Sequence, residues 1–129
     1  MKNLPNYPTG LIALTTVLIN SDGEISEKEL SYIQRLRELE SIPEDIFNQV
    51  RSAILGKPER EVYQIGIDAI NACSDVEKLR AFVRMYHMAM ADGVIHVKEV
   101  RLLLYAIKTT NVDINIVVNL AQQLEGVQS

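Results

Sequence analysis

Two acidic turns carry the residue types in this chain that could bind a metal ion. The sequence reads "DGEISEKE" at residues 22–29 and "DGVIHVKE" at residues 92–99, and five of the eight positions agree. Oxygen ligands of this kind suit hard divalent ions such as Ca²⁺, Mg²⁺ or Mn²⁺. If the chain brings the two turns together, four carboxylates could hold one such ion: Asp22, Glu29, Asp92 and Glu99.

Neither turn matches an ordinary EF-hand loop. With Gly23 at the sixth position of the loop, Glu29 falls at the twelfth, where a calcium loop has its bidentate carboxylate. The first position, which should also carry a carboxylate, is Leu18 in the first copy and Met88 in the second. The acids therefore indicate a non-standard cation site or no site at all.

Helix capping is the alternative explanation of the same turns. If Ser26 is an N-cap, Glu29 lies three residues further on and the two form a capping box. Ile25 and Leu30 then have the spacing of a hydrophobic staple across the same helix start. Capping explains the glycine, the isoleucine and the final glutamate of the motif without a ligand. Only the two aspartates are not required for capping.

The elements around these turns are all predicted to be helical. Apolar residues recur at helical spacing in seven segments, and no stretch shows the sustained alternation of a half-buried strand. The segments lie at about 10–20, 27–39, 41–54, 58–73, 74–92, 96–109 and 113–125. The first is apolar nearly all round, which predicts a central helix.

Helix starts and the turn repeat predict the organisation of the chain. Ser41 and Ser74 are each followed by Glu three residues later, as at capped helix starts, and Pro58 suits the first turn of another helix. Pro5 and Pro8 predict an extended arm over residues 1–8. Residues 9–129 are then one all-α domain, a compact bundle of about seven helices. Its two halves, about 9–73 and 74–126, are expected to be related by an approximate twofold axis.

Composition excludes several classes of function. The net charge of −4 and the pI of about 5.2 argue against nucleic-acid binding, which needs a positive surface. We interpret the scattered arginines, which include Arg80 and Arg84, as parts of solvated helix faces. The strongest apolar run, at 11–19, is too short to span a bilayer, and no signal peptide is recognisable, so we expect a cytoplasmic protein without membrane insertion.

No enzymatic motif is present in the sequence. It has no glycine-rich phosphate loop, no nucleophile elbow and no H-E-x-x-H pair. The single cysteine, Cys73, lies on an apolar helix face without a recognisable histidine partner, which predicts an inert thiol. We therefore expect a non-enzymatic protein.

The two acidic turns and their flanking helices resemble the TerB-like family of tellurite-resistance-associated proteins. The matching stretches are "LINSDGEISEKELSYIQRL" (18–36) and "MAMADGVIHVKEVRLLLYAI" (88–107). The resemblance implies a bacterial cytoplasmic helical bundle, in some members a stress-response component and in others a module beside other domains such as J-domains. It also implies a metal-binding surface at Asp22, Glu29, Asp92 and Glu99. Val94 and Val97 stand where the first copy has Glu24 and Glu27, so a symmetric pair of metal sites is in doubt.

Two functions follow from the sequence. The first is a non-enzymatic interaction module of the TerB-like type, in a stress-response context, with protein partners and with self-association left open. It would need no cofactor, although a divalent cation could bind at its acidic turns. The alternative is a dedicated cation sensor or buffer, in which the repeated acids are themselves the function.

Overall fold

The computed structural model describes residues 4–19, 27–92 and 97–128, without the side chains of 91, 92, 97–99 and 125–128. These ranges form seven helices and contain no strand, which confirms the all-α prediction. The helices are α1 (Asn6–Ile19), α2 (Glu27–Leu39), α3 (Glu44–Ile54), α4 (Glu59–Asn71), α5 (Asp75–Asp92), α6 (Val97–Thr109) and α7 (Ile114–Gln128).

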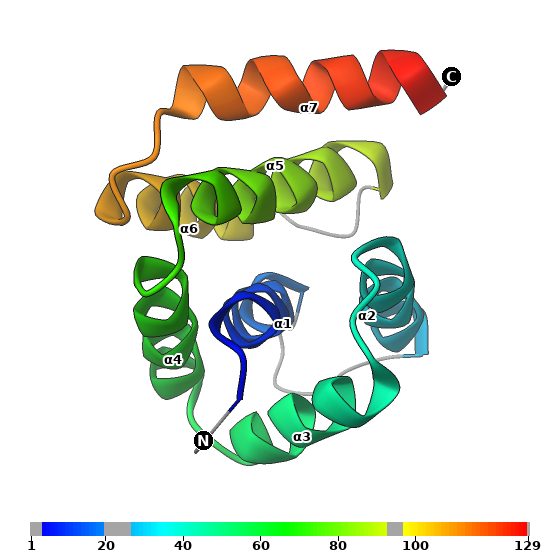
Figure 1. The fold of residues 1–129 in the computed structure, drawn as a ribbon, viewed down its shortest axis with the longest axis vertical. Helices are drawn as coiled ribbons and strands as arrows, with labels where there is room; N and C mark the ends of the chain where they lie inside the picture. Colours follow the sequence, from blue (N-terminus) through cyan, green and yellow to red (C-terminus); the bar gives the residue numbers. More distant parts are fainter. Residues whose placement is uncertain (1–3, 20–26, 93–96, 129) are drawn as a thin grey trace.

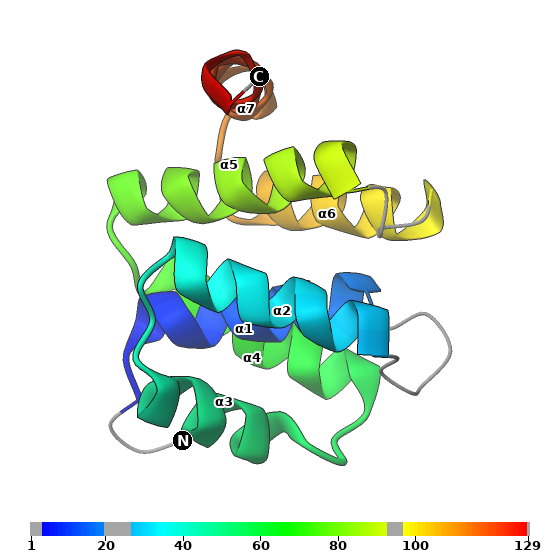
Figure 2. The same cartoon turned by 90° about the vertical axis from the view of Figure 1, so that its right-hand side faces the viewer.

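Helix α1 is the centre of the bundle. It lies between α2 and α4, with α3 on one side and the layer formed by α5 and α6 on the other (Figures 1 and 2). Every residue from Thr9 to Ile19 is buried, as expected for a helix that is apolar nearly all round. Helix α7 lies outermost and packs mainly on α5. None of the described helices is both long and apolar enough to cross a membrane.

Two glycines allow α1 and α4 to approach closely. A Cβ atom at Gly10 of α1 would lie 2.6 Å from Cδ1 of Ile70, and one at Gly66 of α4 would lie 2.7 Å from Cγ of Leu14. The backbone nitrogens of the same two partners would be only 3.1 and 3.2 Å away. A side chain at either glycine would therefore push the helix backbones apart.

Helices α2 and α6 end in the same type of turn. Ser41 and Asn111 have positive φ angles of 54° and 61°. Beyond them, the N–H of Ile42 donates to the carbonyl of Arg37 at 3.0 Å, and that of Val112 donates to the carbonyl of Ile107 at 3.1 Å. This bonding pattern satisfies the last carbonyls of a helix and fixes the direction of the next one.

The bounds of α2 and α6 differ by the same 70 residues that separate the two acidic turns, and so do the starts of α3 and α7. The spatial twofold axis between the halves stays a prediction.

The structure tests three predictions, one about the N-terminal arm and two about helix caps. The arm predicted over 1–8 is too long, because α1 already begins at Asn6 and includes Pro8. Pro8 is tolerated because a first-turn N–H has no partner within the helix. Ser41 is not an N-cap: it takes the left-handed position that ends α2, and Pro43 precedes α3 without a side-chain cap. The Ser74–Glu77 capping box is confirmed by hydrogen bonds of 3.1 and 3.2 Å in both directions.

Replacing Gly66 with alanine tests the close approach of α1 and α4. In an exposed helix this change stabilises by about 1 kcal/mol, because alanine is the better helix former. At Gly66 we expect a loss of about 1–3 kcal/mol from overpacking against Leu14, measured by urea unfolding. Ser52→Ala on the exposed face of α3 is the control and should stay within about 0.5 kcal/mol of wild type. A Gly66→Ala variant at least as stable as wild type would contradict the packing described.

Candidate functional site

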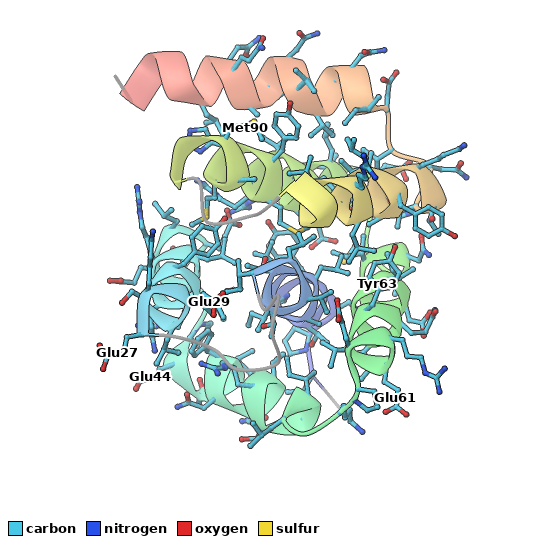
Figure 3. The ribbon with its side chains drawn as sticks, turned by 180° about the vertical axis from the view of Figure 1, so that it is seen from behind. Glu27, Glu29, Glu44, Glu61, Tyr63 and Met90 are labelled. Carbon is cyan, nitrogen blue, oxygen red and sulfur yellow. The ribbon has the colours of Figure 1, made fainter. Side chains whose placement is uncertain are left out.

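Of the four acids predicted as metal ligands, only Glu29 has a side chain that the structure describes. Glu29 lies in the first turn of α2, half-buried, on the side that faces the bundle, whereas Glu27 points away from it (Figure 3). Asp22 lies outside the described residues. Asp92 and Glu99 lie in α5 and α6, but their side chains are not described. Among the side chains that are described, no three carboxylates, histidines or cysteines form a group that could hold a metal ion. Convergence of the four acids stays a prediction.

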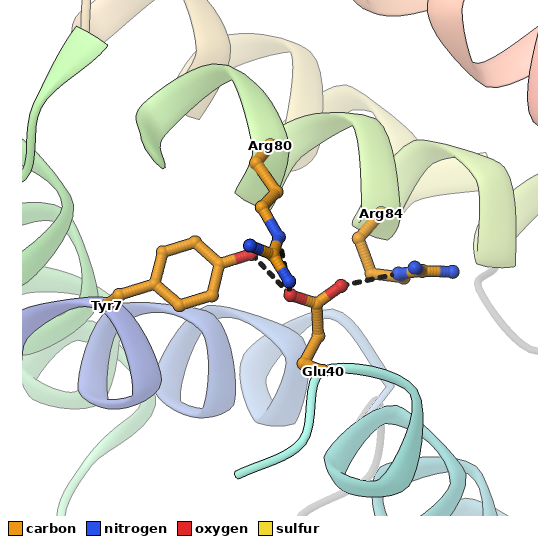
Figure 4. A network of polar contacts seen from close by, with 4 residues as sticks. All are labelled: Tyr7, Glu40, Arg80 and Arg84. Atoms are coloured by element: carbon orange, nitrogen blue, oxygen red, sulfur yellow. Dashed lines mark hydrogen bonds and ion pairs between the residues drawn. The ribbon is translucent and has the colours of Figure 1, made fainter. Parts of the chain in front are cut away.

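A different carboxylate, Glu40, is at the centre of the best-defined polar cluster. Its side chain is completely buried at the turn that follows α2. Tyr7 of α1 donates its hydroxyl to Oε1 at 2.7 Å. From α5, Arg80 donates Nε to Oε1 at 3.1 Å, and Arg84 donates Nε to Oε2 at 2.7 Å (Figure 4). One carboxylate thus joins three segments that are far apart in the sequence.

Burial sets the electrostatics of this cluster. A buried carboxylate is tolerated when charged donors occupy its oxygens, and removing one partner of such a pair typically costs about 3–5 kcal/mol. Burial raises the pKa of Tyr7 well above its usual range, and the hydrogen bond to Glu40 raises it further. The phenol therefore remains a hydrogen-bond donor at neutral pH. Both Glu40 oxygens are engaged, which suits a carboxylate that holds elements together better than one that accepts a proton from a substrate.

The two arginines of the cluster differ in exposure. The Arg80 side chain is 62% exposed and its guanidinium lies 5.5 Å from the centre of the Tyr7 ring. The Arg84 side chain is only 16% exposed, so the interpretation of a solvated arginine is wrong for Arg84. One usable hint in the sequence is the spacing of these two arginines, four residues apart on one helix face. It could not indicate Glu40, which lies 40 and 44 positions away from them.

An open groove of about 490 Å³ lies above this cluster, between α5 and α7. Its lining is predominantly apolar and includes Glu40 and both arginines. The remaining residues of the lining come from the facing sides of the two helices: Val76, Leu79, Val83, Leu120, Gln123 and Leu124. The volume lies within the range of about 300–1,000 Å³ that is usual for small-molecule sites.

One nitrogen of the groove lining lacks a partner among the described residues. Nη1 of Arg84 is buried, and no hydrogen-bond acceptor for it is found in the described part of the chain. Figure 4 shows the guanidinium extending away from Glu40 beyond the Nε atom that makes the contact. An unsatisfied buried donor typically costs about 1–3 kcal/mol, more when it is charged. The cluster therefore retains a hydrogen-bonding capacity that Glu40 does not use.

Other groups with possible chemistry have structural surroundings. Met85, His87 and Met88 are buried in the middle of α5 and pack in the core, whereas Met90 is 50% exposed. Cys73 is half-buried, its thiol contacts the Ala69 carbonyl at 3.3 Å, and burial raises its pKa, as does nearby Glu77. A raised pKa lowers the thiolate fraction that a nucleophile needs.

Comparison with known proteins gives one match. The family model described as tellurite resistance protein TerB matches residues 9–118. The match includes α1 from Thr9 onward, α2 to α6 and the start of α7, and with them Glu40, Arg80 and Arg84. No curated protein and no solved structure matches the chain significantly.

Proposed function

The chain belongs to the tellurite resistance protein TerB family, and we propose that it is a non-enzymatic binding module whose working surface is the groove between α5 and α7. In this proposal the groove receives an apolar group of a partner molecule, in a bacterial stress-response context. The sequence alone predicted only an unspecified protein partner. The groove adds that the partner must present an apolar group that fits between α5 and α7.

The open apolar lining of the groove carries this proposal. Val76 at its border is 76% exposed, and Leu79, Leu120 and Leu124 are only partly buried. Leaving such side chains in contact with water is unfavourable, and apolar surface of this kind often marks a binding site when it lines a hollow. A partner that covered these residues would gain the free energy of removing them from water.

The polar groups near the groove support binding better than catalysis. Glu40 already accepts three hydrogen bonds, and the pKa of Tyr7 is raised, so neither is arranged to transfer a proton near neutral pH. Among the described residues, the groove lining also contains no serine, threonine or cysteine that could act as a nucleophile. The module is therefore proposed to act by occupancy of its groove.

A neutral apolar fluorophore, N-phenyl-1-naphthylamine, tests whether the groove binds apolar groups. We expect saturable fluorescence enhancement with wild type, and at least about tenfold weaker binding with Val76→Glu or Leu124→Glu, since burying one such side chain is worth about 1.5–3 kcal/mol. Ile116→Glu is the matched control, because Ile116 is also exposed on α7 but does not line the groove. If the groove variants bind the dye as wild type does, the proposed surface is wrong.

A divalent-cation sensor or buffer is the second candidate. It is favoured by the spacing of the acids: Asp22 and Asp92, like Glu29 and Glu99, differ by the 70 residues that also separate the bounds of α2 and α6. In this reading the groove is secondary, and a Ca²⁺, Mg²⁺ or Mn²⁺ ion held by the acidic turns is the signal.

Thermal unfolding with and without cations separates the two candidates. A ligand present at 100 times its Kd stabilises the native state by about 2.7 kcal/mol, so a micromolar site must raise the Tm at millimolar Ca²⁺, Mg²⁺ or Mn²⁺. For a binding module that acts through its groove, we expect an unchanged Tm. A raised Tm that is lost in the Asp22→Asn/Asp92→Asn double variant, together with micromolar binding by calorimetry, would establish the sensor instead.

A further inference from the structure

The walls of the groove are predominantly apolar. On α5, Val76, Leu79 and Val83 follow one another at helical spacing on one face, and Leu120 and Leu124 of α7 lie opposite. Arg84 is eight residues beyond Val76, which corresponds to about 12 Å along the helix axis. The groove therefore has mostly apolar walls, with the guanidinium of Arg84 toward one end.

Charges at the bottom of the groove do not cancel. Glu40 is the acid of the described lining, and it faces two guanidinium groups, Arg80 and Arg84. The cluster thus carries one excess positive charge, and the Arg84 side chain is largely shielded from water, which weakens the screening of its charge. An anion that enters the groove would compensate it, and a cation would be repelled.

Arg84 has the free hydrogen-bonding capacity that such an anion requires. Its Nε is used by Glu40, whereas Nη1 is buried and has no acceptor among the described residues. A guanidinium carries five N–H donors in a planar fork that matches a carboxylate. The Arg84 side chain lines the groove and is 16% exposed, so a carboxylate that entered would approach this guanidinium, and a small rotation of the side chain would bring Nη1 to it.

We propose that the groove binds an amphipathic carboxylate, with its apolar chain between α5 and α7 and its carboxylate on Arg84. This inference rests on the proposed function, since it names the chemical class of the ligand for the same groove. The ligand is the free carboxylate and not an anionic membrane surface, because the protein as a whole carries a net charge of −4, which disfavours adsorption to anionic lipid.

Three compounds with the same chain test this proposal on the full-length protein: decanoate, decanol and decyltrimethylammonium, each below its micellar concentration. We expect wild type to bind decanoate at least tenfold more tightly than decanol, and decyltrimethylammonium more weakly than either, by calorimetry at pH 7.5. Arg84→Gln, checked by circular dichroism to be folded, should remove the preference for decanoate over decanol. Arg60→Gln, at an exposed arginine of α4 outside the groove, is the control and should keep the preference.

Each alternative outcome has a separate meaning. Equal binding of decanoate and decanol to wild type would overturn the carboxylate inference and leave the apolar groove in place. This comparison uses wild type alone and so needs no variant that could misfold. Absence of binding of both compounds and of N-phenyl-1-naphthylamine would overturn the proposed function as well. Binding to phosphatidylglycerol vesicles without binding of monomeric decanoate would replace the ligand site by a membrane surface and contradict the inference.

Discussion

The burial of one carboxylate is the constraint on which much of this structure depends. Glu40 has no exposed side-chain surface, and a buried charge without partners would be strongly destabilising. Its partners come from α1 and α5, so satisfying it fixes the turn after α2 against both helices. The turn itself is held by the left-handed Ser41 and by backbone hydrogen bonds to the end of α2. Local turn geometry and long-range ion pairing thus place the same side chain.

The character of the groove follows from this constraint. Because Glu40 is held by two arginines of α5, the side of α5 that borders the groove also carries an excess positive charge. Helix α7 covers this face only partly: Val117 and Ala121 are buried, whereas Leu120 and Leu124 remain partly accessible. The result is an apolar groove beside Arg84, whose Nη1 has no acceptor among the described residues. Stability of the bundle and the proposed recognition in the groove therefore use the same residues.

Local patterns in the sequence were sufficient to predict the helices, but they could not predict the polar cluster around Glu40. Apolar spacing predicted the helices and the central place of α1, because burial of one helix depends on its own composition. The equivalent turn positions Glu40 and Thr110 show the limit: both are buried, but Thr110 is satisfied within its own helix end by the Ala106 carbonyl at 2.9 Å. Glu40 instead requires α1 and α5, and pairing over 33 to 44 residues leaves no local pattern. The prediction that Ser41 is an N-cap is wrong because a capping box and a left-handed helix end both favour short polar residues.

A double-mutant cycle between Glu40 and Arg84 tests the central claim most directly. Glu40→Gln and Arg84→Met, alone and combined, would be compared with wild type by urea unfolding, with circular dichroism to confirm that each variant folds. If the two side chains form the buried pair described, the double variant should lose less stability than the sum of the single variants, with a coupling energy of about 2 kcal/mol or more. Losses that add to within about 0.5 kcal/mol would contradict the account.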